Sequence, residues 1–595
     1  MNINYYKEKI ALNDIHLRKL KSVIRVMPML KIITFLLALT LLILGFQADL
    51  KKECFFAVSF MSLVIFFILQ KKDLKYCRSY SYYSNLNDVY QDEINFLNGN
   101  YSKYYDGEMF VDKKHEFSYD LDIYGENSFF HRINRTKTYE GTICLAKKLI
   151  DITESADDIL LKQKSLSELA DLENFRFNFL VICKGFKFDK RNNKYSYIDS
   201  DKPNSFLSSK VALLLIYASI TLTILTSLLA YFHYIPISIP AFLLIFQLII
   251  PVIYFKKTNK HASEVGRLYN NISRYSTLLN LVDSEEFKTE SNISLKETLF
   301  STHNSLTALS KLASILQRFD QRENAYALVL LNMLYLSDIF LLRSYSKWKE
   351  QYSGCIQEWI DSLAEFEARI SLANYIFNKP NYCLPEVINN SDILIDAKSM
   401  GHPFINEDKL VTNDFKIHKS NFMIITGANM AGKSTFLRCA GINYIMAVNG
   451  MKVCASEFQI SIFQLFSSMR NTDDLSSGIS YFNAELIRIE QLIYFSKKNN
   501  HTLIILDEIL KGTNSKDKLK GSIMFLKEMK KLPISGIIAT HDLELAKLEK
   551  EDPDSFMNYC FEISISESIN YAYKIQKGSS KNFNATLLLE KILYQ

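Results

Sequence analysis

The longest hydrophobic pattern in this chain is a run without charge. From Val211 to Phe255 the sequence contains no Asp, Glu, Lys or Arg. A helix rises about 1.5 Å per residue, so a helix of this length would be about twice as long as a hydrocarbon core of roughly 30 Å is thick. Pro236 and the polar-tipped aromatic side chains before it suit a tight turn at the lipid headgroups. The run therefore predicts a hairpin of two membrane spans, at about 211–232 and 236–255.

Two shorter apolar runs near the N-terminus predict another hairpin. They cover Ile32–Phe46 and Cys54–Leu69, and a polar connection separates them. We place their spans at about 27–47 and 53–70. Each run is shorter than the ~18 apolar residues that identify a span by themselves, so a pair of buried core helices is the alternative.

Charged residues around the two hairpins predict their orientation. Basic side chains lie beside the outer ends of the runs, at Arg18, Lys19, Lys21, Arg25, Lys31, Lys71, Lys72, Lys75, Lys210, Lys256, Lys257 and Lys260. Because basic residues favour the cytoplasmic side, we expect a multi-pass protein of the cell membrane whose soluble parts face the cytoplasm. Lys51 and Lys52 in the first connection oppose this orientation, although two acidic neighbours partly offset them. The runs themselves contain no Asp, Glu, Lys or Arg, so we expect anchors rather than a transport pathway.

Outside the hairpins, the first pattern is that of soluble helices. Residues 76–209 are polar and rich in Tyr and Asn, with an amphipathic helix expected near Ala156–Leu172. Residues 258–375 carry apolar side chains at helical spacing, which predicts long packed helices with these side chains in their core. The clearest core positions are Leu306, Leu309, Leu312, Ile315 and Leu316, followed by Ala327, Leu328, Leu331, Leu334 and Tyr335.

After Pro380, short β-branched runs alternate with helical stretches. The runs Phe422–Ile425, Leu503–Leu506 and Ile537–Thr540 each end at polar residues. This alternation predicts a parallel sheet with crossover helices, a fold that binds ligands at the carboxyl ends of its strands. The predicted organisation is a hairpin segment at 1–75, a soluble connector with the first part of a helical core at 76–209, a second hairpin at 210–256, a helical core domain at 257–399 and an α/β domain at 400–595.

Composition adds few constraints. A chain of 595 residues is expected to contain several domains. A formal net charge of +6, from 70 basic and 64 acidic side chains, neither requires nor excludes a nucleic-acid partner. The nine cysteines include no C-x-x-C pair, so we expect reduced thiols and no zinc site. The charged N-terminus does not have the layout of a cleaved signal peptide.

The segment Gly427–Ser434 fits the phosphate-loop pattern G-x-x-x-x-G-K-S. It follows a predicted strand and precedes a helix that we expect to reach Val448. In such a loop, backbone N–H groups surround phosphates, Lys433 neutralises the β- and γ-phosphates, and Ser434 gives Mg²⁺ an oxygen ligand. The predicted ATP-binding residues are Gly427, Ala428, Asn429, Met430, Ala431, Gly432, Lys433, Ser434 and Thr435.

Two further strands end in side chains that suit ATP hydrolysis. One delivers Asp507, which suits coordination of Mg²⁺, and Glu508, which suits deprotonation of the attacking water. The other delivers His541, a candidate sensor of the γ-phosphate. Either feature alone is more often structural. Together with the phosphate loop they predict an ATPase that uses ATP and Mg²⁺, with Lys433, Glu508 and His541 in catalysis.

The phosphate loop belongs to a larger set of recognisable segments. Thr426–Thr435 carries an Asn-Met pair inside the loop, and Asp473–Glu485 is a serine-rich segment before a predicted helix. Other segments of the set are His402-Pro403, Asn413-Asp414, Asp507-Glu508-Ile509, Gly512-Thr513, Thr540–Leu545 and Tyr571–Gly578, with weaker ones at Asp120–Gly125 and Asn134–Gly141. The set resembles the ATPase domain and core of the MutS family of DNA mismatch-repair proteins. The resemblance implies an α/β P-loop domain of the ABC type after an all-α lever domain, with the second transmembrane hairpin inserted into that helical core.

The resemblance also implies a homodimer with shared ATP sites. Each ATP would lie between the phosphate loop of one subunit and the serine-rich signature of the other, so that Ser480 contacts ATP in trans. From the residues alone, the same segment is an ordinary loop before a helix at 483–495. The chain departs from the family in lacking a mismatch-reading segment near its N-terminus, in having Leu510 and Lys511 where the family has glycine and arginine, and in leaving little room for a C-terminal helix-turn-helix.

Three functions are compatible with these patterns. The first is a membrane-anchored MutS-type ATPase in a repair-type or DNA-structure-related role, in which basic residues after the second hairpin contact DNA phosphates or, equally well, anionic lipid headgroups. The second is an ABC-type transporter ATPase, which is disfavoured because the interval from Lys433 to Asp507 is too short for the helical subdomain of such transporters. The third is a membrane scaffold that binds ATP without DNA. No small-molecule substrate other than ATP is implied.

Overall fold

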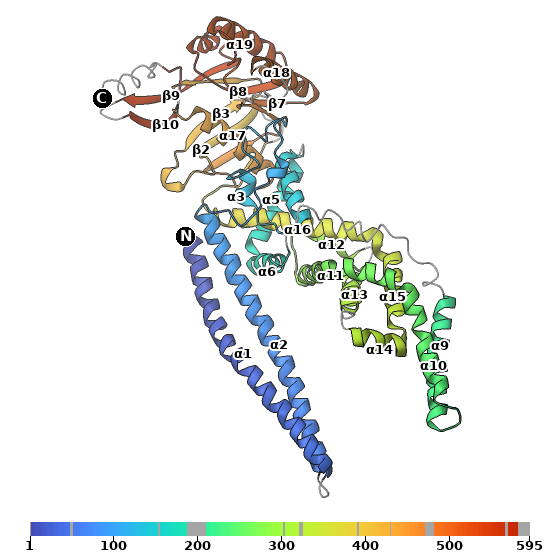
Figure 1. Ribbon diagram of the computed structural model, residues 1–595. Coiled ribbons are helices and arrows are strands. Elements are labelled where there is room, and N and C mark those ends of the chain that lie inside the picture. Colours follow the sequence, from blue (N-terminus) through green and yellow to red (C-terminus); the bar gives the residue numbers. More distant parts are fainter. Residues whose placement is uncertain are drawn as a thin grey trace. The chain divides into compact units, whose positions relative to one another are not determined.

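The chain forms two compact units, one of residues 1–102 with 174–185 and one of residues 103–173 with 186–595 (Figure 1). The first is a long helical hairpin with one additional helix, and the second contains the helical core and the α/β domain. The computed structural model describes residues 2–47, 52–152, 155–186, 210–301, 304–320, 325–388, 392–428, 430–470, 481–565 and 569–580.

The first unit is built from α1 (Asn2–Gln47), α2 (Lys52–Leu97) and α6 (Glu173–Cys183). Aromatic side chains pack between the three helices. The ring centroid of Tyr90 on α2 lies 4.8 Å from that of Phe177 on α6 and 5.9 Å from that of Tyr6 on α1. The predicted spans 27–47 and 53–70 occupy only part of these helices. In particular, α2 continues without interruption past residue 75, where the sequence suggested a boundary.

In the apolar part of this hairpin the polarity is the reverse of that in a soluble helix pair, with polar side chains inside and apolar side chains outside. Ser59 and Ser62 are buried between the helices and donate to the carbonyl groups of Ala38 and Thr34, at 2.7 and 3.0 Å. Large apolar side chains face outward instead, and Phe60 is 71% exposed. Among the described residues, the helices long and apolar enough to cross a membrane are Ile3–Gln47, Lys52–Leu97 and Leu213–Tyr231.

The second apolar segment differs from the prediction in its second half. α9 (Lys210–Tyr231) covers the first predicted span, but the predicted span 236–255 is not one helix. It is divided at Leu248 into α10 (Ser238–Gln247) and α11 (Ile249–Ser284). The physical cause is Pro251, which has no N–H to donate and whose ring would clash with the carbonyl group four residues earlier.

The helical core continues from α11 through five further helices. On α13 the predicted core positions are confirmed for Leu309, Leu312 and Leu316, which are buried. On α14 the prediction of core positions is wrong, because Leu331, Leu334 and Tyr335 are exposed. The helices are α12 (Glu290–Phe300), α13 (Ser305–Asp320), α14 (Ala325–Tyr335), α15 (Ser337–Tyr352) and α16 (Ile356–Phe377).

Three short helices from the connector pack against α16. They are α3 (Phe129–Ile133), α4 (Tyr139–Ile150) and α5 (Ala156–Asp171), the last matching the helix expected near 156–172. Glu367 of α16 fixes the start of α4, because its carboxylate accepts hydrogen bonds from the backbone N–H groups of Lys137 and Thr138 at 2.6 and 3.2 Å. Residues far apart in sequence therefore form one helical layer.

The α/β domain contains two sheets and the helices that connect their strands (Figure 1). The smaller sheet has the order β1-β5-β2-β3. Its strands are β1 (Glu386–Val387), β2 (Ile393–Met400), β3 (Asn413–His418) and β5 (Glu457–Ile460). The larger sheet has the order β10-β9-β4-β8-β7-β6. Its strands are β4 (Phe422–Gly427), β6 (Gln464–Ser468), β7 (Thr502–Asp507), β8 (Ile534–Thr540), β9 (Phe556–Ile565) and β10 (Ile569–Lys577), and the helices of the domain are α17 (Lys433–Val448), α18 (Tyr481–Lys498), α19 (Ser515–Met529) and α20 (Leu548–Glu551).

The larger sheet confirms the three predicted strands. β4, β8, β7 and β6 are parallel neighbours, β9 is parallel to β4, and only β10 runs antiparallel at one edge. Every residue of β4 and β8 is buried, which explains why these strands read as continuous β-branched and apolar runs rather than as alternating ones. The α17 helix ends at Val448, as the sequence predicted.

Candidate functional site

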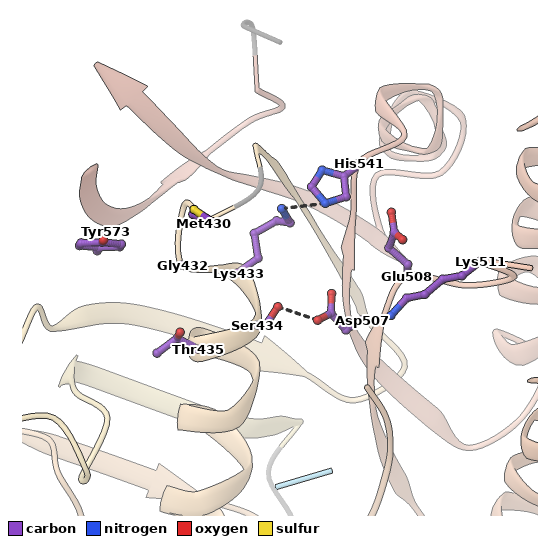
Figure 2. A pocket seen from close by; sticks show the side chains of 10 residues that line it. All are labelled: Met430, Gly432, Lys433, Ser434, Thr435, Asp507, Glu508, Lys511, His541 and Tyr573. Carbon is purple, nitrogen blue, oxygen red and sulfur yellow. Dashed lines mark hydrogen bonds between the residues drawn. The ribbon is translucent and has the colours of Figure 1, made fainter. Parts of the chain in front are cut away.

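The candidate site lies at the carboxyl ends of β4, β7 and β8. The register pairs Thr426 with Thr540 and Asp507 with Ala539, so the three strands end at nearly the same level. The residues that follow these strand ends therefore converge at one edge of the sheet. Here the structure brings together the phosphate loop, the acidic pair and His541 (Figure 2).

The phosphate loop needs glycine at both of its ends. Gly427 has φ of 144°, and a Cβ atom there would lie 2.6 Å from the carbonyl oxygen of Phe561 on β9. Gly432 has φ of 110° and immediately precedes the first residue of α17. These left-handed conformations place the N-terminus of α17, with its unpaired N–H groups, beside the site. Asn429, a predicted ATP-binding residue, lies outside the described residues.

Lys433 is buried and bound to its own loop. Its Nζ donates to the carbonyl oxygens of Gly427 and Ala428, both at 2.8 Å, and lies 3.4 Å from Nε2 of His541. Burial lowers the pKa of Lys433 to about 8, although Asp507 and Glu508 oppose this shift. Burial and the nearby Lys433 charge also lower the pKa of His541, which favours its neutral form. The lysine is thus positioned for an anion but held by neutral carbonyl groups.

Ser434 and Asp507 form the closest polar pair of the site. The Ser434 hydroxyl donates to Oδ2 of Asp507 at 2.6 Å, although the two residues come from different elements (Figure 2). Both groups offer oxygen, the ligand type that Mg²⁺ prefers, and Mg²⁺ takes most of its other ligands from water and phosphate. Within the described part of the chain, no group of three or more His, Cys, Asp or Glu side chains is placed to hold a metal ion alone. Ser434 and Asp507 are the residues of the site that fit Mg²⁺.

Glu508 is held from its backbone and from its side chain. Its φ of 63° is unusual for a non-glycine residue, and its N–H donates to the Ala539 carbonyl at 2.8 Å. Its carboxylate pairs with Nζ of Lys518 at 3.2 Å. Sequence reasoning missed Lys518. The asparagine cap that starts α19 at residue 514 places Lys518 in the first turn of that helix, and this was the available signal.

Two cavities meet at the site. The first, of about 440 Å³, is lined by Met430, Gly432, Lys433, Ser434, Thr435, Asp507, Glu508, Lys511, His541 and Tyr573 (Figure 2). The second, of about 320 Å³, is mainly apolar and shares Gly432, Thr435 and Tyr573 with the first. Burial lowers the pKa of His402, which lines the second cavity, to about 4, so this histidine is neutral at physiological pH. The polar cavity suits phosphates, and the apolar one suits a planar ring.

Of the predicted signature Asp473–Glu485, residues 473–480, Ser480 included, lie outside the described residues, and its last residues begin α18. The described residues on either side of 471–480 form hydrogen bonds to other parts of the domain. Glu485 on α18 accepts hydrogen bonds from the N–H groups of Lys511 and Gly512, both at 3.0 Å. Before the signature, the N–H of Arg470 donates to Asp120 at 2.8 Å. Arg470 is therefore tied to the connector, and Glu485 to the turn after Glu508.

Comparison with known proteins supports the identity of this domain. Residues 423–586 match the family described as MutS domain V. The DNA mismatch repair protein MutS of Pseudothermotoga lettingae is 33% identical over 202 residues, which are 33% of this chain and 24% of that protein. The protein of the same name from Clostridium kluyveri is 32% identical over 236 residues, 38% of this chain and 26% of that protein. The DNA mismatch repair protein MutS of Thermotoga maritima is 31% identical over 217 residues, which are 36% of this chain and 27% of that protein.

The chain thus spans about a quarter of the length of these relatives. The match covers the phosphate loop, the acidic pair and His541, which the structure places around one cavity. This chain therefore carries a domain of the MutS family at residues 423–586, which confirms the resemblance inferred from the motifs of the ATPase domain.

Proposed function

We propose that this chain is a membrane-anchored, Mg²⁺-dependent ATPase of the MutS type, with two ATP sites completed across a homodimer. The observation that supports this most directly is the convergence of Lys433, Ser434 and Asp507 with Glu508 and His541 around one polar cavity. These residues lie at the start of α17 and directly at or after the ends of β7 and β8, and they are the residues predicted for neutralising phosphate, holding Mg²⁺ and hydrolysis. The trans contact of Ser480 remains part of the proposal.

Each residue has a distinct role in this proposal. Lys433 exchanges the carbonyl groups of its own loop for the β- and γ-phosphates, which are stronger acceptors. Glu508 accepts the proton of the attacking water, and neutral His541 hydrogen-bonds to that water or to the γ-phosphate. Ser434 and Asp507 would hold Mg²⁺, which when bound neutralises phosphate charge. The second cavity would receive the adenine ring beside the Tyr573 side chain.

Membrane anchoring is supported by the reversed polarity of both apolar segments. The Ser59 and Ser62 hydroxyl groups donate to carbonyl groups inside the first segment, Nε2 of Gln247 donates to Thr223 inside the second, and large apolar side chains face outward. In water the outward face would be polar, whereas lipid favours apolar side chains there. We propose that both segments anchor the chain in the cell membrane with the ATPase domain in the cytoplasm.

The activity is tested with the full chain in lipid nanodiscs. We expect ATP hydrolysis that requires Mg²⁺ and that is lost in Lys433→Ala, because the phosphates lose their neutralising charge. Lys520→Ala is the matched control, since that lysine is exposed on α19. Normal ATP affinity in Lys433→Ala would overturn the site assignment.

A DNA partner is a further part of the proposal, since the relatives are named DNA mismatch repair proteins. The same nanodisc assay is run with homoduplex, mismatched and branched DNA. Stimulation by any of the three would support a role at DNA. The same turnover with all of them would favour the ATP-binding scaffold without DNA.

A further inference from the structure

The helix α14 presents an apolar surface in a part of the chain that carries no charge. From Asn324 to Ser337 the sequence contains no Asp, Glu, Lys or Arg. Along the described part of α14 the exposed side chains are large and apolar, at Val329, Leu330, Leu331, Leu334 and Tyr335. A soluble helix normally shows polar side chains on its exposed face. This surface therefore needs an apolar environment.

The one amide side chain on this part of α14 faces inward. Asn332 is buried, its Nδ2 donates to the Leu328 carbonyl at 3.0 Å, and its Oδ1 accepts from the N–H of Asp338 at 2.9 Å. These bonds close the turn in which Leu336 takes φ of 49° and the helix direction changes by 82°. The polar groups at the turn are thus satisfied internally, and the outer face is left to hydrocarbon side chains.

The neighbours of α14 belong to the second apolar segment. α14 contacts α10, and on the adjoining helix α15 the Phe340 ring lies 5.6 Å from Tyr217 of α9. The α9–α10 pair has the same reversed polarity, because Gln247 is buried and its Nε2 donates to Thr223 Oγ1 at 2.6 Å and to Ser219 Oγ at 2.9 Å. The apolar surface of α14 therefore adjoins the surface of a hairpin that we propose to lie in the membrane.

We propose that α14 is itself embedded in the lipid bilayer beside α9 and α10, as a short segment that enters the hydrocarbon core and turns back at Leu336. Its 11 residues give a helix of about 16 Å, roughly half of the thickness of the core, so it does not cross. Lipid is the occupant favoured here because α14 contacts α10 of the proposed membrane hairpin and because the exposed side chains on the described part of α14 are large and apolar. The inference rests on the proposed membrane anchoring and adds a third membrane element to the second unit.

Tryptophan quenching by lipids with brominated acyl chains tests this proposal in the full chain. Leu331→Trp probes α14, Leu225→Trp probes α9, and Leu160→Trp on α5 is the soluble control. The three leucines are matched in exposure, at 46, 56 and 42%. The native Trp348 and Trp359 are buried and give the baseline in the unsubstituted protein. We expect the added emission of Leu331→Trp to fall as much as that of Leu225→Trp, with no loss for Leu160→Trp.

The possible outcomes separate this proposal from the anchoring on which it rests. Quenching of Leu225→Trp without quenching of Leu331→Trp would leave α9 in the membrane and overturn the placement of α14. Absence of quenching at both positions would overturn the anchoring as well. Shielding of Leu331→Trp from both brominated lipid and aqueous iodide would mean that protein, such as a second copy, covers α14, and would also refute the proposal. Leu330→Trp serves as the second probe if Leu331→Trp does not fold.

Discussion

At the scale of single residues, the charge of Lys433 is the most sensitive property of the site. The two carbonyl groups that bind Nζ are neutral, and the surrounding protein removes water, so its pKa falls to about 8. A bound triphosphate would restore the preference for the charged form. ATP binding above the free pKa must therefore take up a proton, whereas binding well below it takes up none.

This difference predicts a pH dependence of ATP affinity. The dissociation constant is expected to be flat below pH 8 and to rise above it, approaching a tenfold increase per pH unit, because one proton is bound with the nucleotide. Titration calorimetry in buffers of different ionisation heat measures that proton directly. A constant affinity from pH 7 to 9.5, without proton uptake, would contradict the assignment of this lysine as the phosphate ligand.

Glu508 makes a prediction about turnover rather than about binding. Glu508→Gln keeps the size of the side chain and an oxygen near Lys518, but it removes the group that accepts a proton. We expect ATP binding to be retained and the turnover number to fall about 10²–10⁴-fold, the usual range for loss of a general base. Glu528→Gln, at an exposed carboxylate of α19, is the control. Undiminished hydrolysis in Glu508→Gln would remove this residue from the role of base.

At the scale of elements, the segment at residues 120–122 joins the connector to the α/β domain. Asp122 bonds to Arg438 on α17 at 3.0 Å and to Arg470 before the signature at 2.6 Å. Asp120 accepts from Ser467 at 3.0 Å, and Arg488 on α18 lies 3.8 Å from it. Both aspartates thus hold the helix that follows the phosphate loop and the two flanks of the signature.

Asp122→Asn tests how much the charge of Asp122 at this junction contributes to the stability of the protein. Asn tolerates the left-handed backbone at φ of 54°, so the substitution isolates the loss of charge. Because the pairs are about one third exposed, we expect a cost of about 1 kcal/mol and a melting temperature lower by about 2–4 °C. Glu126→Gln, at an exposed carboxylate four residues after Asp122, is expected to cause no change. Equal melting temperatures for the two variants would show that the junction does not depend on this charge.

The features that could be predicted are defined by neighbouring residues in the sequence, whereas the others depend on residues that are far apart in the chain. β4, β7 and β8 were predictable because each buried run ends directly at a chemical group, and the parallel topology brings those ends together. The partners of Asp122 were not, since nothing in a local pattern points to arginines hundreds of residues away. The stripe on α14 shows a further limit: periodicity tells which side chains share a face but not whether protein, water or lipid covers it.

At the scale of the whole molecule, the proposed dimer makes the ATP site dependent on two chains. Arg470 and Glu485, on either side of residues 471–480, are tied within their own subunit to the connector and to the turn after Glu508. In the proposal, Ser480 of the signature contacts the ATP that the other subunit binds. Its contact with ATP therefore has to be tested between chains rather than within one.

Mixing two inactive variants provides that test. Ser480→Ala removes the trans hydroxyl and Lys433→Ala removes the phosphate ligand, so homodimers of either are expected to be inactive. In a heterodimer, the intact phosphate loop of the first faces the intact signature of the second, and one of the two sites is restored. Random exchange of subunits makes half of the dimers heterodimers, so about a quarter of the wild-type turnover is expected. The double variant mixed with Lys433→Ala is the control and should stay inactive, because no dimer in that mixture contains an intact phosphate loop. If mixing the single variants restores no activity although exchange is demonstrated by affinity tags, Ser480 does not act across the dimer.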